Sequence, residues 1–337
     1  MTTEERIAGI IALSDELRSL DLAAKTELFG SASAKNAWFT DDSLAMAFDG
    51  ILHFLNRDTL TDWLGRYQIT NESKNVGLVL AGNIPLVGFH DFLSVLLSGN
   101  KAKIKPSSQD SVLLKFISDS LIEINAEFDN QITYVDKLTG IDAVIATGSD
   151  NSSRYFKKYF KDIPHIIRKN RTSVAVLNGK ESESELALLG KDIFSYFGLG
   201  CRNVAKVYVP KGFDMTKLLD ALESHQEVRN HPKYFNNYEY NKAIYLVNRV
   251  QHLDTGYALF KESIDIVSPL SVIYYEEYKD LDTLENKLAS HSKKLQCIVS
   301  NTAINKTITV PIGKSQFPDI DDYADNVDTM EFLCSLK

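Results

Sequence analysis

Cys201 is the residue of this sequence whose surroundings most suggest chemistry. It stands in "SYFGLGCRNVAKVYVP", after Gly198 and Gly200, between a helix-like and a strand-like stretch. A thiolate is a strong nucleophile, and neighbouring glycines let a substrate approach the backbone closely. Taken alone, the same pattern also fits a buried cysteine at a helix–strand junction. Cys297, inside the apolar "LQCIVS", and Cys334, near the C-terminus, have no such surroundings.

Asn83 in "AGNIPL" is a second candidate for chemistry. A side-chain amide can donate a hydrogen bond to an oxyanion that develops during a reaction. The alternative is that Asn83 caps the helix that follows it.

Two further stretches have the residue types of an anion site. Lys105 lies near the end of "KAKIKPSS", and Thr147, Gly148 and Ser149 form a turn in "ATGSDNSSRYF". A lysine at the end of a strand and the first amides of a helix both favour a phosphate. The alternatives are an edge strand whose lysines oppose aggregation and an ordinary loop between a strand and a helix.

The standard motifs of several enzyme classes are absent from the sequence: GxGxxG, GxxxxGK[ST], HExxH and GxSxG. The three cysteines lie far apart without a CxxC pair, which predicts no disulfide framework, no metal site and a reducing cytoplasm. A net charge of -8 disfavours nucleic-acid binding. The charged, amphipathic N-terminus does not resemble a signal peptide, and we expect no membrane span.

The candidate residues must be positioned by an alternation of strands and helices. Residues 4–65 have helical spacing, and Asp42 is a candidate helix cap. Strands are then predicted at 75–82, 101–106, 131–135 and 141–149, with helices at 85–100, 107–124 and from 150 onward, the second of them capped by serines. This order indicates an α/β fold with a parallel sheet. Ligands of such sheets bind beyond the carboxyl ends of the strands, where Asn83, Lys105 and Thr147 fall.

A second α/β section follows. We predict strands at 172–179, 204–209, 243–247, 271–275 and 295–300, and helices at 183–197, 214–224 and 281–291. The expected organisation is residues 1–170 for N-terminal helices and a dinucleotide-binding domain, and 171–310 for a catalytic domain. Residues 311–337 form a tail that packs back on the body through apolar residues such as Tyr323, Met330 and Leu333.

Several stretches, taken in order over roughly residues 75–300, resemble motifs of the aldehyde dehydrogenase superfamily. "GNIPL" resembles N-F-P-L, "LLSGNKAKIKPS" resembles A-x-x-A-G-N-x-x-x-x-K-P-S, and "ATGS" resembles F-T-G-S. "FGLGCRN" resembles the G-Q-x-C segment, "DIVSPL" resembles E-I-F-G-P-V, and "KLQCIVS" resembles G-L-x-A-x-V-F. The length and the tail "DDYADNVDTMEFL" are most similar to long-chain acyl-CoA reductases, the family of the fatty-acid reductase of bacterial luminescence.

The resemblance implies an aldehyde-dehydrogenase-like α/β fold, with a parallel-sheet cofactor-binding domain and a second α/β domain that carries the nucleophilic cysteine. It also implies reduction of a fatty acyl thioester to an aldehyde with NADPH, through an acyl group on Cys201. Asn83 and the backbone N–H of Cys201 would form the oxyanion hole, and Asp265 stands where the family has a Glu that holds the nicotinamide ribose.

The remaining cofactor residues follow from the same resemblance. Lys105 would contact the adenosine ribose or its phosphate, and Thr147, Gly148 and Ser149 would lie along the nicotinamide and pyrophosphate. Many NAD-preferring members have a Glu in place of Ser108, so the serine leaves room for a 2′-phosphate and favours NADPH, with NADH as the alternative.

The sequence also departs from the family. The motif E-L-G-G-K should fall near "IIRKNRTSVAV", where there is no Glu. That Glu helps water attack the thioester in hydrolytic members, so its absence suits an enzyme that keeps its acyl-cysteine for hydride. Arg202 is a candidate for lowering the pKa of Cys201, and His225 and His231 are candidate proton donors.

Several alternatives stay open at this point. One is an acyl-phosphate reductase or an aldehyde-oxidising enzyme on the same fold, and another is an inactive binding homologue. The acyl donor is expected to be an acyl-CoA or another acyl thioester, with an acyl-transferring protein as a further candidate partner. No counterpart of the oligomerisation hairpin of larger relatives is recognised, which leaves homo-oligomer formation open.

Overall fold

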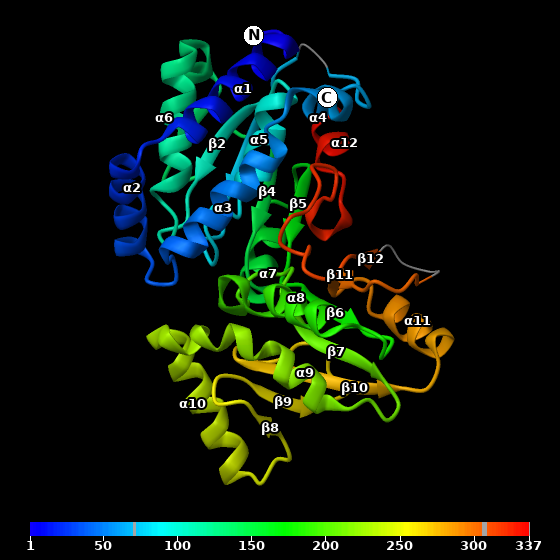
Figure 1. The fold of residues 1–337 in the computed structure, drawn as a ribbon. Helices are drawn as coiled ribbons and strands as arrows, with labels where there is room; N and C mark the ends of the chain where they lie inside the picture. The colour runs from blue at the N-terminus through cyan, green and yellow to red at the C-terminus, as the bar shows by residue number, and fades with distance from the viewer. Residues whose placement is uncertain (70–71, 305–308, 337) are drawn as a thin grey trace. The chain divides into compact units, whose positions relative to one another are not determined.

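The computed structural model describes residues 1–69, 72–304 and 309–336. The chain divides into two compact units. Unit 1 consists of Met1–Asn170 and Pro318–Lys337, and unit 2 consists of Arg171–Phe317. Each unit has its own sheet of mainly parallel strands (Figure 1). The expected α/β fold class is therefore confirmed.

Unit 1 begins with helices, as predicted. They are α1 Thr3–Ser19, α2 Leu22–Lys35, α3 Asp41–Phe54 and α4 Arg57–Leu64. Helix α1 starts with a capping box between Thr2 and Glu5, and it buries one apolar face that includes Ile10 and Leu13. The predicted cap at Asp42 is wrong. Thr40 caps α3 instead, and Asp42 lies in the first turn, where a carboxylate favours the helix dipole.

The described residues of unit 1 form a sheet in the order β3-β2-β1-β4-β5, in which all neighbours are parallel. Its strands are β1 Asn75–Val79, β2 Lys101–Lys105, β3 Ile132–Tyr134, β4 Ala143–Thr147 and β5 His165–Arg168. The connecting helices are α5 Phe89–Leu97, α6 Leu113–Ile124, α7 Asp150–Tyr159 and the short 3₁₀ helix η1 Ala126–Asn130. Helix α1 contacts both α5 and α6, whereas α7 packs on β4 and β5 (Figure 1).

Two expectations about unit 1 need correction. The lysines at 101, 103 and 105 do not belong to an edge strand, because β2 lies between β1 and β3. The serines at 107 and 108 do not cap α6, whose N-cap residue, Val112, makes no side-chain cap hydrogen bond. Instead, Ser107 pairs with Asp110 in a turn between β2 and α6.

The C-terminal segment of unit 1 contains the 3₁₀ helix η4 Ala324–Asn326 and the helix α12 Thr329–Cys334. Trp63 donates a hydrogen bond from Nε1 to the hydroxyl of Tyr323 over 2.7 Å. The guanidinium of Arg168, at the end of β5, forms a buried ion pair with Asp91 at 2.7 Å and donates to the hydroxyl of Thr329 over 2.9 Å. These contacts hold the segment against α4, α5 and β5.

The described residues of unit 2 form a sheet in the order β12-β11-β6-β7-β10-β9-β8. Only the pair β8–β9 is antiparallel among those described. The strands are β6 Thr172–Val176, β7 Val204–Pro210, β8 Leu253–Asp254, β9 Leu259–Glu262, β10 Val272–Tyr278, β11 Leu295–Val299 and β12 Thr309–Val310. The helices are α8 Glu183–Phe194, η2 Ser195–Gly198, α9 Met215–Leu222, η3 Glu223–Asn230, α10 Pro232–Val247 and α11 Leu281–Ser290.

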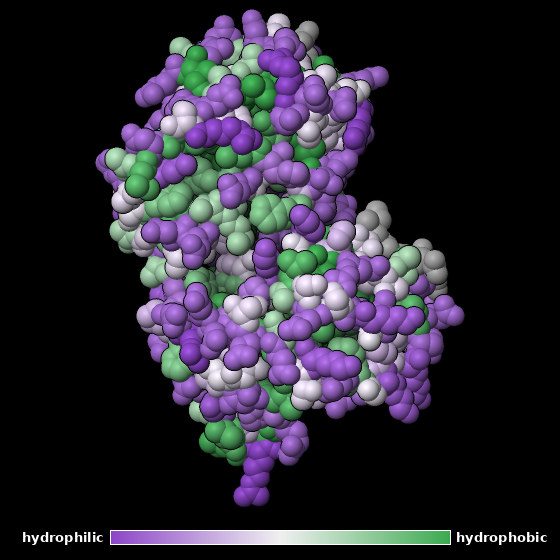
Figure 2. Space-filling view, in the orientation of Figure 1, coloured by the Kyte–Doolittle hydropathy of each residue, from purple (hydrophilic) through white to green (hydrophobic). Residues whose placement is uncertain are grey.

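The strand predicted at 243–247 is wrong, because these residues form the last turns of α10. The buried residues of α10 are Tyr234, Tyr238, Asn241 and Tyr245, which recur at helical spacing. A short apolar run such as "AIYLV" fits a strand or a helix equally well, and only the longer pattern separates the two. Tyr240, Leu246 and Val247 of this helix stay exposed. The face drawn in Figure 2 mixes hydrophilic residues with small apolar groups.

Candidate active site

Asn83 lies in the loop that follows β1, and this loop is fixed from two sides. The side chain of Asn36 donates to the carbonyl oxygen of Gly82 over 3.0 Å. The backbone N–H of Leu86 donates to the carboxylate of Asp110 over 2.8 Å. Leu86 has a φ of 55°, a left-handed conformation that a bulky residue adopts only when its surroundings enforce it. The loop therefore presents the exposed Asn83 on a firmly held backbone.

The loops after β1 and β2 touch at Gly82. A Cβ atom at this position would lie 2.5 Å from the hydroxyl oxygen of Ser107, so a larger residue would push the two loops apart. Asp110 is the buried anchor under both loops. Burial raises its pKa to about 6, against the opposing effect of the backbone N–H groups of Leu86 and Leu113.

The candidate residues of unit 1 lie at the carboxyl ends of neighbouring strands. In the register of the sheet, Val79 of β1 pairs with Lys105 on one side and with Ala146 on the other. The chain moves from β1 to β2 and β3 on one side, and then to β4 and β5 on the other side. The strand order thus reverses between β1 and β4, which is where such sheets bind ligands. Asn83 follows β1, and Thr147 ends β4.

The turn after β4 leads directly into α7. Ser149 is the N-cap, and its hydroxyl accepts a hydrogen bond from the backbone N–H of Ser152. A Cβ at Gly148 would come within 2.9 Å of Phe156, so glycine permits this tight turn. Lys105 and Ser108 are exposed beside the same edge of the sheet. A cation, hydroxyls and first-turn amides at a switch point fit the phosphates of a dinucleotide.

Cys201 lies in unit 2, in the loop between η2 and β7, and it is half-buried. The backbone before it is unusual. Tyr196, Phe197 and Gly198 have φ values of 50°, 58° and 80°, and two aromatic residues in the left-handed region are costly. Sparsely populated backbone conformations cluster at functional sites, so this turn agrees with a role for Cys201.

Asn203 holds this loop in shape, and it was not singled out from the sequence. Its side-chain oxygen accepts a hydrogen bond from the N–H of Gly200 over 2.7 Å. Its side-chain nitrogen donates to the carbonyl oxygen of Ser195 over 2.8 Å and lies near two other carbonyls at the end of α8. Asn203 is 4% exposed. The available signal was a polar amide placed directly before the apolar strand "VAKVYV".

Ser173 of β6 connects Cys201 to a second cysteine. Its hydroxyl donates to the carbonyl oxygen of Cys201 over 2.9 Å and lies 3.1 Å from the sulfur of Cys297 in β11. The backbone N–H of Cys297 donates to the same hydroxyl oxygen over 3.2 Å. Cys297 is buried in its strand, as its apolar sequence predicts.

Asp265 also lies in unit 2, in the loop between β9 and β10. It is exposed, and its backbone N–H donates to the hydroxyl of Ser263 over 3.2 Å. Unit 2 therefore carries Cys201 and Asp265, and unit 1 carries the other predicted site residues, namely Asn83, Lys105, Ser108, Thr147, Gly148 and Ser149.

The two candidate histidines differ in their surroundings. His225 lies 2.9 Å from the carbonyl oxygen of Ala187 and stacks on Phe194, and a Cβ at Gly190 would collide with its ring. These contacts give His225 a packing role. His231 caps α10, and its ring centroid lies 4.3 Å from that of Phe197 in the Cys201 loop. The suggested effect of Arg202 on Cys201 stays a prediction.

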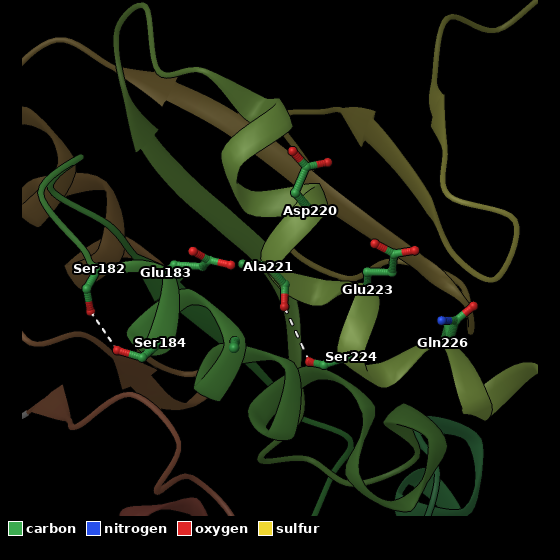
Figure 3. A pocket seen from close by; sticks show the side chains of 9 residues that line it. Ser182, Glu183, Ser184, Asp220, Ala221, Glu223, Ser224 and Gln226 are labelled. Atoms are coloured by element: carbon green, nitrogen blue, oxygen red, sulfur yellow. Dashed lines mark hydrogen bonds between the residues drawn. The ribbon is translucent and has the colours of Figure 1, made fainter.

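A groove of about 700 Å³ in unit 2 does not include Cys201 or Asp265 in its lining (Figure 3). It is open and lies between the start of α8 and the segment from α9 to η3, with Glu183, Asp220 and Glu223 in its walls. Within the described ranges, no group of His, Cys, Asp and Glu side chains is arranged to hold a metal ion. None of the described helices is both long and apolar enough to cross a membrane.

A sequence model of the acyl-CoA reductase (LuxC) family matches residues 33–277. The chain belongs to this family. The matched range contains every predicted site residue from Asn83 to Asp265. The resemblance to acyl-CoA reductases is thereby confirmed, while the roles of the individual residues stay predictions.

The long-chain acyl-protein thioester reductase of Aliivibrio fischeri is one curated relative of this chain. The two are 26% identical over 223 residues, which cover 60% of this chain and 46% of the relative. The chain thus spans about half the length of the curated relative that it matches.

Solved aldehyde dehydrogenases share the fold. Aldehyde dehydrogenase 21 of Physcomitrella patens matches 99% of this chain and 84% of its own, with a TM-score of 0.71 and 11% identity. The Bacillus cereus enzyme matches 91% of this chain and 73% of its own, with a TM-score of 0.64 and 16% identity. At these identities, the likeness concerns the fold alone.

Proposed function

We propose that this protein reduces a fatty acyl thioester, such as an acyl-CoA, to an aldehyde with NADPH, through an acyl group on Cys201. Membership of the acyl-CoA reductase family supports the reaction class. The observation that carries the proposal is the position of Cys201, half-buried in a strained loop that Asn203 and Ser173 fix from both sides.

The first step is transfer of the acyl group. The thiolate of Cys201 attacks the thioester carbonyl, the new C–S bond forms, and the thiolate of the donor leaves. This covalent step divides one difficult reaction into two easier ones. By the family resemblance, the amide of Asn83 and the backbone N–H of Cys201 donate to the oxyanion. The fixed loop after β1 supports this role, because a donor must already be aimed when charge develops.

The cofactor residues fit a nicotinamide dinucleotide. Lys105, Ser108 and the turn from Thr147 to Ser149 lie beside the switch point of the unit 1 sheet, and Asp265 is an exposed carboxylate in unit 2. A nicotinamide held by these residues would supply the hydride that reduces the acyl-cysteine. Lys105 and Ser108 favour the 2′-phosphate of NADPH, since no carboxylate stands at 108. The aldehyde dehydrogenases of Bacillus cereus and Mycobacterium tuberculosis, solved as NAD+ complexes, support a nicotinamide cofactor.

The residues around β5 favour hydride over water as the second reactant. The stretch "IIRKNR" has no carboxylate, and its Arg168 is engaged by Asp91. With no carboxylate in this stretch to activate water, the acyl-cysteine would persist until reduction expels the Cys201 thiolate and releases the aldehyde. The acyl donor is a thioester of CoA or of a protein, as the name of the Aliivibrio fischeri relative suggests.

Mass spectrometry of the intact protein tests the proposal. The protein is mixed with an acyl-CoA panel without NADPH, and we expect a mass increase of one acyl group that maps to Cys201. NADPH should then discharge it as aldehyde. Cys201→Ala should remove the adduct and turnover. Cys334→Ala is the matched control, because burial raises the pKa of that thiol to about 11 and leaves it a poor nucleophile.

Two results would count against the proposal. One is a folded wild-type protein that takes no acyl group from any CoA or carrier-protein thioester. The other is free acid formed from an aldehyde and NADP+, which would favour an aldehyde-oxidising enzyme. Turnover with an acyl phosphate but not with a thioester would identify an acyl phosphate as the substrate, and the acyl-cysteine mechanism would stay the same.

A further inference from the structure

The strand that follows Cys201 carries a fully buried lysine. Lys206 of β7 is 0% exposed. Its ammonium lies 2.5 Å from the carboxylate of Glu276 in β10 and 4.7 Å from the ring centroid of Tyr208. It also donates to the carbonyl oxygen of Ser263 over 2.7 Å. Ser263 is the first residue after β9 and begins the loop that contains Asp265.

Stability does not explain this lysine. Burial lowers the pKa of Lys206, and the bond to Glu276 only partly opposes that effect. Replacing a buried ion pair by apolar side chains of similar size is often neutral or stabilising. Glu276 has a second cation, Lys287 of α11, and would stay paired without Lys206. Of these two lysines, only Lys206 bonds to Ser263.

The loop from Ser263 to Ser268 is fastened to β7 at both ends. Lys206 holds the carbonyl of Ser263, and the hydroxyl of Ser268 lies 3.0 Å from the carbonyl oxygen of Ala205. Asp265 lies between these two attachments. Its negative charge is close enough to favour the charged form of Lys206. Strand β7, which follows Cys201, therefore holds the Asp265 loop together with β10, whose Tyr275 and Val272 accept from the N–H of Ser263 and the hydroxyl of Ser268.

We infer that Lys206 is a positioning residue, which fixes Ser263 and thereby holds Asp265 where it binds the nicotinamide ribose. The inference rests on the proposed function, because the role of Asp265 depends on a nicotinamide cofactor. Lys206 itself touches no reacting group. It acts through the backbone of a loop, so its loss should weaken nucleotide binding and leave acylation of Cys201 intact.

The test compares Lys206→Met with Lys287→Met. Both variants remove one cation from Glu276, but only the first frees the carbonyl oxygen of Ser263, whose N–H stays bonded to Tyr275. We expect Lys206→Met to raise the Kd for NADPH about tenfold, the loss typical of one hydrogen bond to a charged group. Acylation of Cys201 by an acyl-CoA in the absence of nucleotide should stay at the wild-type level in both variants. Lys287→Met should bind NADPH like the wild type.

A double-mutant cycle separates positioning from a general structural role. In an Asp265→Ala background, Lys206→Met should add little to the Kd, because the group it positions is already gone. Additive effects would overturn the inference, and so would equal losses in the two lysine variants or loss of Cys201 acylation in folded Lys206→Met.

Hydrogen exchange makes the inference independent of the cofactor. Peptides spanning residues 259–270 should exchange faster in Lys206→Met than in the wild type or Lys287→Met. If the wild type binds no nicotinamide nucleotide, the proposed function and the role of Asp265 both fail, while exchange still decides whether Lys206 holds the loop. Unchanged exchange in Lys206→Met overturns the inference whatever the nucleotide does.

Discussion

The hydroxyl of Ser173 donates its one proton to the carbonyl oxygen of Cys201, 2.9 Å away. The same oxygen therefore acts as acceptor for its other partners, the thiol and the backbone N–H of Cys297. Ser173 is fully buried, so its hydroxyl has no water as a substitute partner. The peptide that follows Cys201 is thus held by a hydroxyl on the neighbouring strand.

Ser173→Ala should slow acylation of Cys201 without abolishing it. The carbonyl oxygen of Cys201 loses the hydrogen bond from Ser173, which typically contributes about 0.5–1.5 kcal/mol, and the loop is free to shift. A misplaced nucleophile loses rate even when its chemistry is unchanged. The rate is measured by quenched mass spectrometry after mixing with an acyl-CoA.

Cys297→Ala is the control for that substitution. It leaves the bond from Ser173 to Cys201 in place and removes only a buried sulfur. We expect acylation close to the wild-type rate, with a modest loss of stability from the smaller side chain. If Cys297→Ala slows acylation as much as Ser173→Ala, the effect comes from packing of the strands and not from the hydroxyl.

Asp110 should contribute less and less to the stability of unit 1 as the pH rises from 4 to 7. The pKa of Asp110 is raised from 3.8 in the unfolded chain to about 6 in the fold by burial, so the folded state binds the proton more tightly. Its contribution is fully present below pH 3.8 and is lost as the pH passes 6. A shift of this size corresponds to at most about 3 kcal/mol.

Asp110→Asn should remove this part of the pH dependence and stabilise unit 1 at pH 8. An Asn keeps an acceptor for the N–H of Leu86 and carries no charge to bury. Both tryptophans, Trp38 and Trp63, lie in unit 1, so urea unfolding followed by their fluorescence reports this unit. The exposed Asp62→Asn is the control and should keep the wild-type slope. A slope unchanged in Asp110→Asn would refute the assignment to Asp110.

The sequence predicts the alternation of strands and helices well where the pattern is long. The run from Asn75 to Thr147 alternates short apolar strands with amphipathic helices, an order that is typical of a parallel sheet. The run at 243–247 fails, because its apolar residues continue the face of α10 that Tyr234 and Tyr238 begin. The cap at Thr40 was missed because Asp42, in the first turn, is an equally good capping type.

The residues of the candidate site also form two groups, those that the sequence singles out and those that only the structure reveals. Cys201, Asn83 and Lys105 stand in short motifs, so their types and order suffice to single them out. Ser173 and Lys206 act through contacts with residues distant in the sequence, and no local pattern marks them. Asn203 bonds to nearer residues, and its place before an apolar strand is a weak signal. Positioning residues of this kind become visible only when the register of the sheet is known.

The choice between NADPH and NADH should depend on the residue at 108. Ser108 is exposed in the loop after β2, near the cation of Lys105 at the strand end. Ser108→Glu would place a carboxylate where the 2′-phosphate of NADPH is proposed to bind, and it would offer an acceptor to the ribose hydroxyls of NADH. We expect KM for NADPH to rise about 10- to 100-fold while KM for NADH falls or stays level.

Gln109→Glu is the matched control, because it adds the same charge at the next exposed position of the same loop. A general electrostatic effect would raise KM for NADPH equally in both variants, whereas direct contact confines the change to residue 108.

Lys105→Ala should weaken the binding of NADPH more than the binding of NADH, since it removes a cation that pairs with the extra phosphate. Equal losses for the two nucleotides would place Lys105 at the shared ribose instead and would leave Ser108 as the sole determinant of the preference.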